Sequence, residues 1–170
     1  MFVSMLILML GLDCYSMCNN VTTDMLSGAT YEYMYTLKYP TSEVPEGSEA
    51  CYVKSLEKEK DGYTLDITVI GIDSDNPYYN VDVKKGKSIV TASLSVAQRY
   101  GVAEGDKLIL TDEAAGTDYA FTVDSISDYS AGLAVFMDID SMRELFRQDD
   151  DYYNMVLSDK ALDIDEGRIY

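Results

Sequence analysis

The sequence predicts an α+β fold, with a sheet-and-helix subdomain and an inserted small β-barrel-like subdomain. Three observations predict it. Residues 31–39 and 63–72 alternate apolar and polar side chains with the period of two that is typical of half-buried strands. After the polar segment 73–80, short strand patterns and tight turns follow one another, interrupted by short helical patterns. The 170 residues are enough for one domain with its own core.

The first element is an apolar run, FVSMLILMLGL, at residues 2–12. It has about half the length that spans a bilayer, and three interpretations stand: the outer end of a membrane helix, a core or interfacial helix, or a signal peptide. A signal peptide has a basic leader and small residues at its cleavage site, whereas the first basic residue here is Lys38. We therefore predict that residues 1–24 form the outer end of a transmembrane helix. Four polar side chains would mark its exit into water: Asp13, Ser16, Asn19 and Asn20.

The next elements are expected to form one sheet layer covered by a helix. In the strand 31–39, one face carries Tyr31, Tyr33, Tyr35, Leu37 and Tyr39. A turn between Pro40 and Pro45 leads to a predicted helix at residues 46–59, whose inward side chains would be Ala50, Val53 and Leu56. Asp61-Gly62 predicts a hairpin turn before the strand 63–72.

The β-rich second part is predicted at about residues 80–148, inserted into a domain of residues 25–170. Its closely spaced strands favour a small barrel or a strongly curled sheet. The expected elements are a strand at 88–91, a helix at 92–100 that Gly101 ends, strands at 106–111 and 119–126 around a turn at 113–118, and a strand at 133–137.

The last elements are expected to return the chain to the first sheet. Ser141 and Glu144 fit a capping box that opens a helix, and the side chains expected to be buried on that helix are Met142, Leu145 and Phe146. An acidic turn at 149–151 precedes a strand at 152–157. Residues 163–166 resemble the acidic start of a further helix, so we expect the natural protein to continue after Tyr170.

The composition excludes several classes of function. Thirty Asp and Glu against thirteen Lys and Arg give a formal net charge of −17, which repels nucleic acids and anionic membranes alike. Histidine is absent, so no Ser-His-Asp or Cys-His catalytic device can be built within the chain. There is no phosphate-binding loop of the nucleotide-hydrolase type. We expect no catalytic residues and no cofactor.

Cysteines and carboxylates give no specific metal or redox site. Cys14, Cys18 and Cys51 lack the Cys-x-x-Cys spacing of zinc and thioredoxin-type centres, and their redox state is left open. Residues 73–84 begin like a calcium loop, but they carry Tyr78 at the glycine position and end on lysine. Residues 138–140 and 149–151 are best explained as acidic turns and helix caps.

One segment resembles a known family. SIVTASLSVAQRYGVAEGDKLIL, residues 88–110, is similar to the part of FtsX-like (MacB-type) ABC-transporter permeases in which a strand leads into a short helix, a glycine, a Val-x-x-Gly-Asp turn and a second strand. The matching residues are Gly101, Val102, Gly105 and Asp106. Residues 65–72, 119–127 and 133–145 resemble further parts of the extracytoplasmic domain in the same order.

The resemblance implies a non-catalytic extracytoplasmic domain of a permease in the cell membrane. Such a permease pairs with a cytoplasmic ABC ATPase subunit and holds membrane-embedded helices, and a permease dimer is compatible with it. ATPase-driven motion would pass through the membrane to substrate export or to a partner outside. Two other functions stay open: a secreted or membrane-tethered ligand-binding module, which would have a tyrosine-lined pocket, and a hydrolase, which would need a buried pair of carboxyl groups in a cleft.

Overall fold

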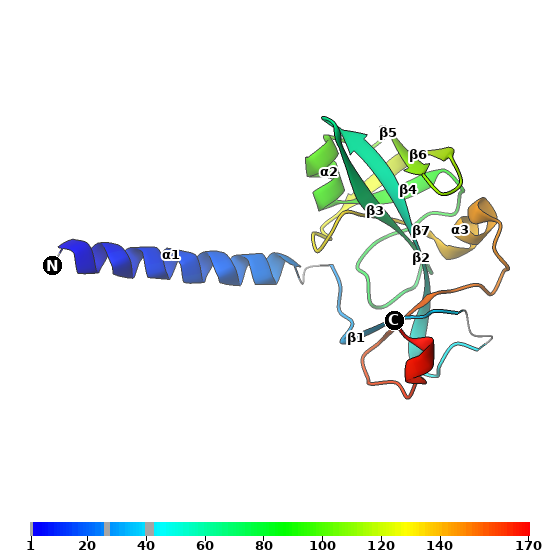
Figure 1. Ribbon diagram of the computed structural model, residues 1–170, viewed down its shortest axis with the longest axis horizontal. Helices are drawn as coiled ribbons and strands as arrows, with labels where there is room; N and C mark the ends of the chain where they lie inside the picture. The colour runs from blue at the N-terminus through cyan, green and yellow to red at the C-terminus, as the bar shows by residue number, and fades with distance from the viewer. Residues whose placement is uncertain (1, 26–27, 40–42) are drawn as a thin grey trace.

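A computed structural model describes residues 2–25, 28–39 and 43–170, and within the first helix it describes the side chains of Met5 and of residues 7–17. One long helix leads into a folded body of strands with three short helical segments (Figure 1). In chain order the elements are α1 (Phe2–Met25), β1 (Tyr33–Thr36), β2 (Ser48–Lys60), β3 (Tyr63–Ile72), β4 (Ile89–Ser93), α2 (Leu94–Tyr100), β5 (Lys107–Asp112), β6 (Thr117–Ser127), β7 (Ala134–Asp138), α3 (Ile139–Phe146), β8 (Met155–Ser158) and the 3₁₀ helix η1 (Glu166–Arg168).

The strands form one sheet in the order β1-β8-β2-β3-β7-β4-β6-β5. Because β5 also pairs with β2, at Thr111 and Glu57, the last six strands close into a small barrel. The β3–β7 and β4–β6 pairs are parallel, and the remaining pairs are antiparallel. The predicted α+β fold with a barrel-like part is therefore confirmed.

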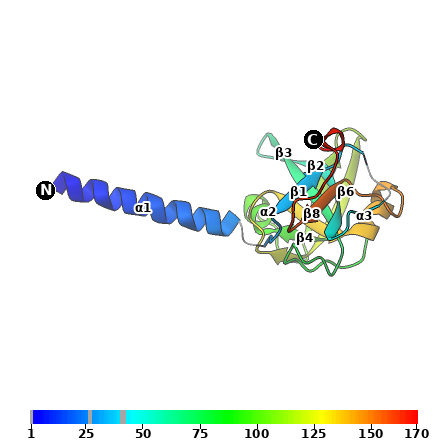
Figure 2. The same cartoon turned by 90° about the horizontal axis from the view of Figure 1, so that it is seen from below.

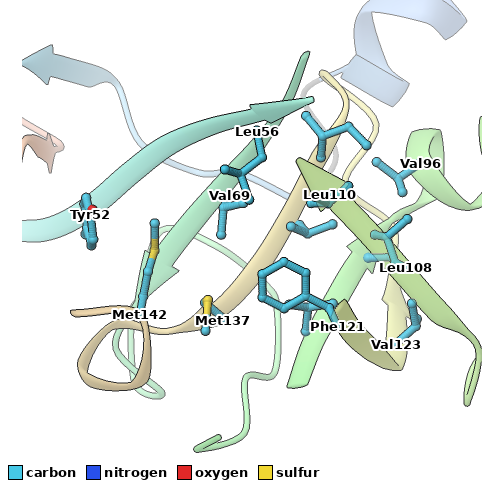
Figure 3. Close-up of a cluster of buried hydrophobic side chains, with 14 of the residues drawn as sticks. Tyr52, Leu56, Val69, Val96, Leu108, Leu110, Phe121, Val123, Met137 and Met142 are labelled. Atoms are coloured by element: carbon cyan, nitrogen blue, oxygen red, sulfur yellow. The ribbon is translucent and has the colours of Figure 1, made fainter. Parts of the chain in front are cut away.

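The barrel interior is filled by apolar side chains from every one of its strands and from the two short helices (Figure 3). At the position that faces α3, β3 carries Gly71, where a Cβ atom would meet Met142 Sδ at 2.8 Å and Ile139 Cα at 3.2 Å. The missing side chain allows α3 to approach the sheet closely. The fully buried side chains labelled in Figure 3 include Leu56, Val69, Leu108, Leu110, Phe121 and Met137.

The hairpin between β2 and β3 forms at the predicted turn. Asp61 and Gly62 have φ angles of 55° and 79°, and Lys60 pairs with Tyr63. Two consecutive positive φ angles are typical of the type I′ turn that suits the twist of adjacent strands. The predicted strand at residues 63–72 is confirmed to the residue as β3.

The predicted helix at residues 46–59 is wrong, because this segment forms the long strand β2. Ala50, Val53 and Leu56 do recur at a helical spacing, but Ala50 and Val53 are only half-buried. Long-range pairing decides the structure: residues 48–51 pair with β8, and residues 52–60 pair with β3. Tertiary hydrogen bonding overrides the local helical pattern, as it often does for amphipathic segments of mixed propensity.

The segment at residues 88–110 has the predicted order of strand, helix, turn and strand, as β4, α2, a tight loop and β5, but the helix begins at Leu94 and not at residue 92. Gly101 ends α2 in the left-handed conformation (φ 67°) and its N–H donates to Ala97 O. In the loop, Gly105 also has a positive φ of 87°, and Asp106 Oδ2 accepts a hydrogen bond from Ala103 N. Glycine at both positive-φ positions avoids the strain that a side chain would bring.

The predicted capping box at Ser141 and Glu144 is placed three residues too late. The N-cap of α3 is Asp138, whose buried carboxylate accepts hydrogen bonds from Ser141 N (2.9 Å) and Ser141 Oγ (2.8 Å). An Asp side chain caps a helix as well as Ser does, so the pattern alone allowed both registers. Of the side chains expected inside, Met142 is fully buried, whereas Leu145 and Phe146 are half-buried.

Near the ends of the body, the predicted elements exist but are shorter. β1 keeps four of the nine expected residues, and Tyr33 and Tyr39 on its expected inner face are 40% and 71% exposed, while Leu37 is buried. Leu37 is the residue of this face that joins a buried cluster, together with Tyr153 and Val156. The last strand, β8, pairs with β1 and β2 as expected. The predicted final helix is a single 3₁₀ turn, η1.

Candidate functional site

Helix α1 projects away from the folded body (Figures 1 and 2). In its first half, apolar residues occupy consecutive positions and therefore all sides of the helix, since each residue turns by about 100°. Their side chains are 56–65% exposed at Met5, Ile7, Leu8, Met9, Leu10 and Leu12. A helix that is apolar all round is normally buried in protein or in lipid.

The second half of α1 is more polar. Asp13 and Ser16 are exposed, as expected for an exit into water, whereas the side chains of Asn19 and Asn20 lie outside the described residues. Within the part of the chain that the structure describes, no helix combines the length and the apolar character needed to cross a membrane. The apolar stretch of α1 is about 16 Å long at 1.5 Å per residue, roughly half of a bilayer core.

The segment that follows α1 is fixed to the body by backbone contacts. Thr30 N donates to Tyr78 O (2.8 Å), and Asn80 N donates to Gly28 O (3.2 Å). The Tyr31 ring meets the edge of Tyr79, with centroids 5.7 Å apart. A displacement of residues 28–31 would therefore act directly on the loop before β4.

Strand β2 connects the barrel to strands β8 and β1. Its thirteen residues pair with β8 at one end and continue to the tip of the β2–β3 hairpin in the barrel. The side chain of Asn154, just before β8, is hydrogen-bonded to the backbone of this strand. Val53 N donates to Asn154 Oδ1, and Asn154 Nδ2 donates to Val53 O, both at 2.7 Å. β2 is therefore one continuous strand that is hydrogen-bonded both to β8 and to the barrel strand β3.

Two of the acidic segments named in the sequence, residues 73–84 and 138–140, have structural roles. Asp138 caps α3, and Asp140 pairs with Arg143 at 3.0 Å. In the calcium-like segment, Asp73 Oδ1 accepts a hydrogen bond from Ser74 N and Asn76 Oδ1 accepts from Tyr78 N, so both side chains stabilise their own turn. Among the described residues, no group of three Cys, Asp or Glu side chains could hold a metal ion.

Two carboxyl groups on the body have raised pKa values. Partial burial, followed by the neighbouring carboxyl groups of Glu113 and Asp66, raises the pKa of Glu57 on the barrel wall. Burial together with the nearby Asp75 and Asp73 raises the pKa of Glu49. The catalytic carboxyl groups of a glycosidase stand about 5 Å or more apart across a cleft, whereas Glu57 and Glu113 are direct neighbours.

A third of the fifteen tyrosines are buried in the core. Tyr79 packs against Tyr129 and Phe136, with ring centroids 5.9 and 5.2 Å apart. Five tyrosines are buried: Tyr52, Tyr78, Tyr79, Tyr129 and Tyr153. A hollow of about 520 Å³ beside β8 contains one tyrosine, Tyr78, which is not the tyrosine-lined pocket expected of a ligand-binding module.

Among known proteins, the chain is similar to solved structures only. No family model matches the chain, and no curated protein matches it either. Among solved structures, the extracellular domain of the noncanonical ABC-type transporter YknZ from Gram-positive bacteria is similar to 77% of this chain and 86% of that domain, with 17% sequence identity and a TM-score of 0.45.

Proposed function

We propose that the chain is the non-catalytic extracytoplasmic domain of an FtsX-like ABC-transporter permease, held at the membrane by α1. The observation that carries the proposal is the exposed apolar half of α1, which projects away from the body. Such a surface is costly in water and is covered by lipid or by other apolar helices. Residues 2–12 would lie at the outer end of a membrane helix, with Asp13 and Ser16 at its exit.

The body suits the transmission of motion. The segment after α1 is hydrogen-bonded to the loop at residues 78–80, and β2 links strands β8 and β1 to the barrel. A movement that reaches residues 28–31 would therefore be passed to this loop and on to the body. The domain would pass ATPase-driven motion to an exported substrate or to a partner outside the membrane.

The absence of histidine from the sequence and the structural roles of the acidic turns favour a domain without catalysis. A cytoplasmic ATPase subunit would act on it through the membrane part of the permease. These features support the proposal together with the resemblance of residues 88–110 to the permease family.

Flotation with phosphatidylcholine vesicles tests the position of α1. We expect the 170-residue chain to float with the vesicles, and Leu8→Asp to weaken the association about tenfold or more, because a carboxylate would enter the apolar region. Ser16→Asp is the matched control, since it places the same charge on the exposed polar half of the helix and should float like the wild type.

The melting temperature of the body separates membrane binding from folding. It should be the same for Leu8→Asp and the wild type, because Leu8 is 65% exposed on a helix that projects from the body. A chain that stays in the vesicle-free fraction, or a body that melts earlier in Leu8→Asp, would show that α1 packs on protein and would contradict the proposal.

A further inference from the structure

A hollow of about 620 Å³ lies between α3 and the loop before β4. Helix α3 is at the end of the body away from α1 (Figures 1 and 2). The loop is fixed to the helix, because Gly86 N donates to Ser141 Oγ at 2.9 Å. Asp150, in the acidic turn after α3, also lines the hollow. Its volume is in the range of small-ligand sites in proteins, about 300–1,000 Å³.

Most basic side chains of the hollow are already paired with acidic ones. Lys87 Nζ lies 3.0 Å from Glu144 Oε2, and Arg143 Nη1 lies 3.0 Å from Asp140 Oδ1. Lys85 is exposed, and its side chain has no ion pair among the residues that the structure describes. Lys85 is therefore the cation of the hollow that is open to a ligand.

Asp138 differs from the other acidic side chains of the hollow, because it is only 2% exposed. Its Oδ2 accepts hydrogen bonds from Ser141 N (2.9 Å) and Ser141 Oγ (2.8 Å). Its other oxygen, Oδ1, has no hydrogen-bond partner in the described part of the chain and is accessible where Asp138 lines the hollow. A buried carboxylate is normally paired with a cation, because removing its charge from water is costly. The open oxygen therefore offers a binding point for a cation.

The acidic side chains around the hollow do not suit a metal ion. Within the described ranges, no three Cys, Asp or Glu side chains are grouped so that they could hold a metal. Ca²⁺ takes about 6–8 oxygen ligands, whereas an ammonium group forms a charge-assisted hydrogen bond to a single carboxylate oxygen. Asp138 therefore suits an ammonium group, and Lys85 suits an anionic group of the same ligand.

We propose that this hollow binds a small zwitterion of the α-amino-acid class, whose ammonium group donates to Asp138 Oδ1 and whose carboxylate contacts Lys85. The hydrogen bonds from Gly86 to Ser141 and from Ser141 to Asp138 hold the carboxylate in place before a ligand arrives. The remaining volume would take the side chain of the ligand. The site does not involve α1, so it is independent of the function proposed above.

The test follows the backbone amides of Gly86 and Ser141 by two-dimensional heteronuclear NMR of the 170-residue chain in mild detergent. L-alanine, L-glutamine and L-phenylalanine are added in turn up to about 20 mM, because ligands of this size bind with modest affinity. We expect saturable shifts with at least one of them. Asp138→Asn keeps the helix cap, since Asn caps a helix as well as Asp does, but it removes the charge and should weaken binding about tenfold.

Asp165→Asn is the matched control for this variant. Asp165 caps η1 through Oδ1, which accepts a hydrogen bond from Gly167 N at 2.8 Å, and it does not line the hollow. The control changes the net charge by the same amount and should bind within about twofold of the wild type. Asp138→Asn that binds as tightly as this control would overturn the proposal.

A second set of ligands tests the two charged groups without any protein variant, so it holds even if Asp138→Asn fails to fold. N-acetyl-L-alanine has no ammonium group and should cause no shift, whereas ethylamine lacks the carboxylate and should bind about threefold more weakly than L-alanine. The proposal is overturned if none of the three amino acids shifts these amides, or if N-acetyl-L-alanine binds like L-alanine. Ethylamine that binds as tightly as L-alanine would overturn the assignment to a zwitterion.

Discussion

At the scale of single residues, Cys51 shows how burial determines chemical behaviour. Its side chain is fully buried in the cluster that contains Tyr79 and Phe136. Burial, with a smaller effect of the nearby Glu49, raises the pKa of its thiol to about 12. Since the thiolate is the reactive form, Cys51 is protected from thiol reagents by the fold, whereas Cys14 on α1 is exposed.

We therefore predict that Cys51 stays unreactive in the native protein. In a variant with Cys14→Ser and Cys18→Ser, a thiol-reactive chromogenic disulfide should label almost no protein at about pH 8, because the thiolate is scarce and inaccessible. The same variant should be labelled completely after unfolding in guanidinium chloride. Rapid labelling of the folded variant would contradict the burial of Cys51 in β2.

At the scale of elements, the contact between β3 and α3 depends on one glycine. Gly71→Ala would place a methyl group against Met142 Sδ and the backbone of Ile139. We expect the free energy of unfolding to fall by about 1–3 kcal/mol, as for other overpacked positions, in urea unfolding followed by circular dichroism.

Gly132→Ala is the matched control for this contact. A Cβ atom at Gly132 meets nothing within 4 Å, and its φ is not in the left-handed region. The control should change the free energy of unfolding by less than about 0.5 kcal/mol. If the two alanine variants have equal stability, α3 does not pack on Gly71 as described.

At the scale of the whole molecule, negative charge opposes the folded state. The net charge of −17 makes carboxylates repel one another when the chain is compact. The pKa values of Glu49 and Glu57 are raised in the fold, so the native state binds more protons than the unfolded state just above their ordinary pKa. Stability linked to these groups therefore increases as the pH falls from neutral.

Asp112 changes stability with pH in the opposite direction, because its pKa is lowered in the folded state. A hydrogen bond from Lys54 (2.8 Å), together with one from Ala115 N, holds the pKa of its carboxyl group below the usual range. A lowered pKa contributes stability above the unfolded value, and this contribution is lost as the pH falls through the folded value. Protonation of Asp112 thus limits the gain in stability at acid pH.

We predict that the free energy of unfolding rises from about pH 8 to about pH 5 and falls below about pH 4. Urea unfolding at a series of pH values measures it. Glu57→Gln should flatten the rise, because the raised carboxyl group is removed, and salt at about 0.5 M should reduce the rise by screening. Stability that decreases steadily from pH 8 to pH 5 would contradict the linkage.

Local rules sufficed where one short stretch sets the geometry. The Asp61-Gly62 turn, the end of α2 at Gly101 and the strand at residues 63–72 were predicted because φ preferences and strict alternation act between neighbours. Local patterns gave the wrong prediction for β2, where apolar residues at a helical spacing and a strand pattern coexist. The boundaries proposed for the inserted part, about residues 80–148, stay a prediction.

The sequence by itself determined the composition-driven features of this protein: its acidic surface, its lack of histidine chemistry, the apolar start of α1 and the strand-rich character of the body. Only the tertiary structure decided that residues 48–60 form a strand and that Thr111 meets Glu57 to close the barrel. The physical reason is the distance along the chain between the residues that interact. Turns and caps depend on neighbouring residues, whereas strand partners are chosen among segments far apart in the chain, whose pairing depends on the packing of the whole body.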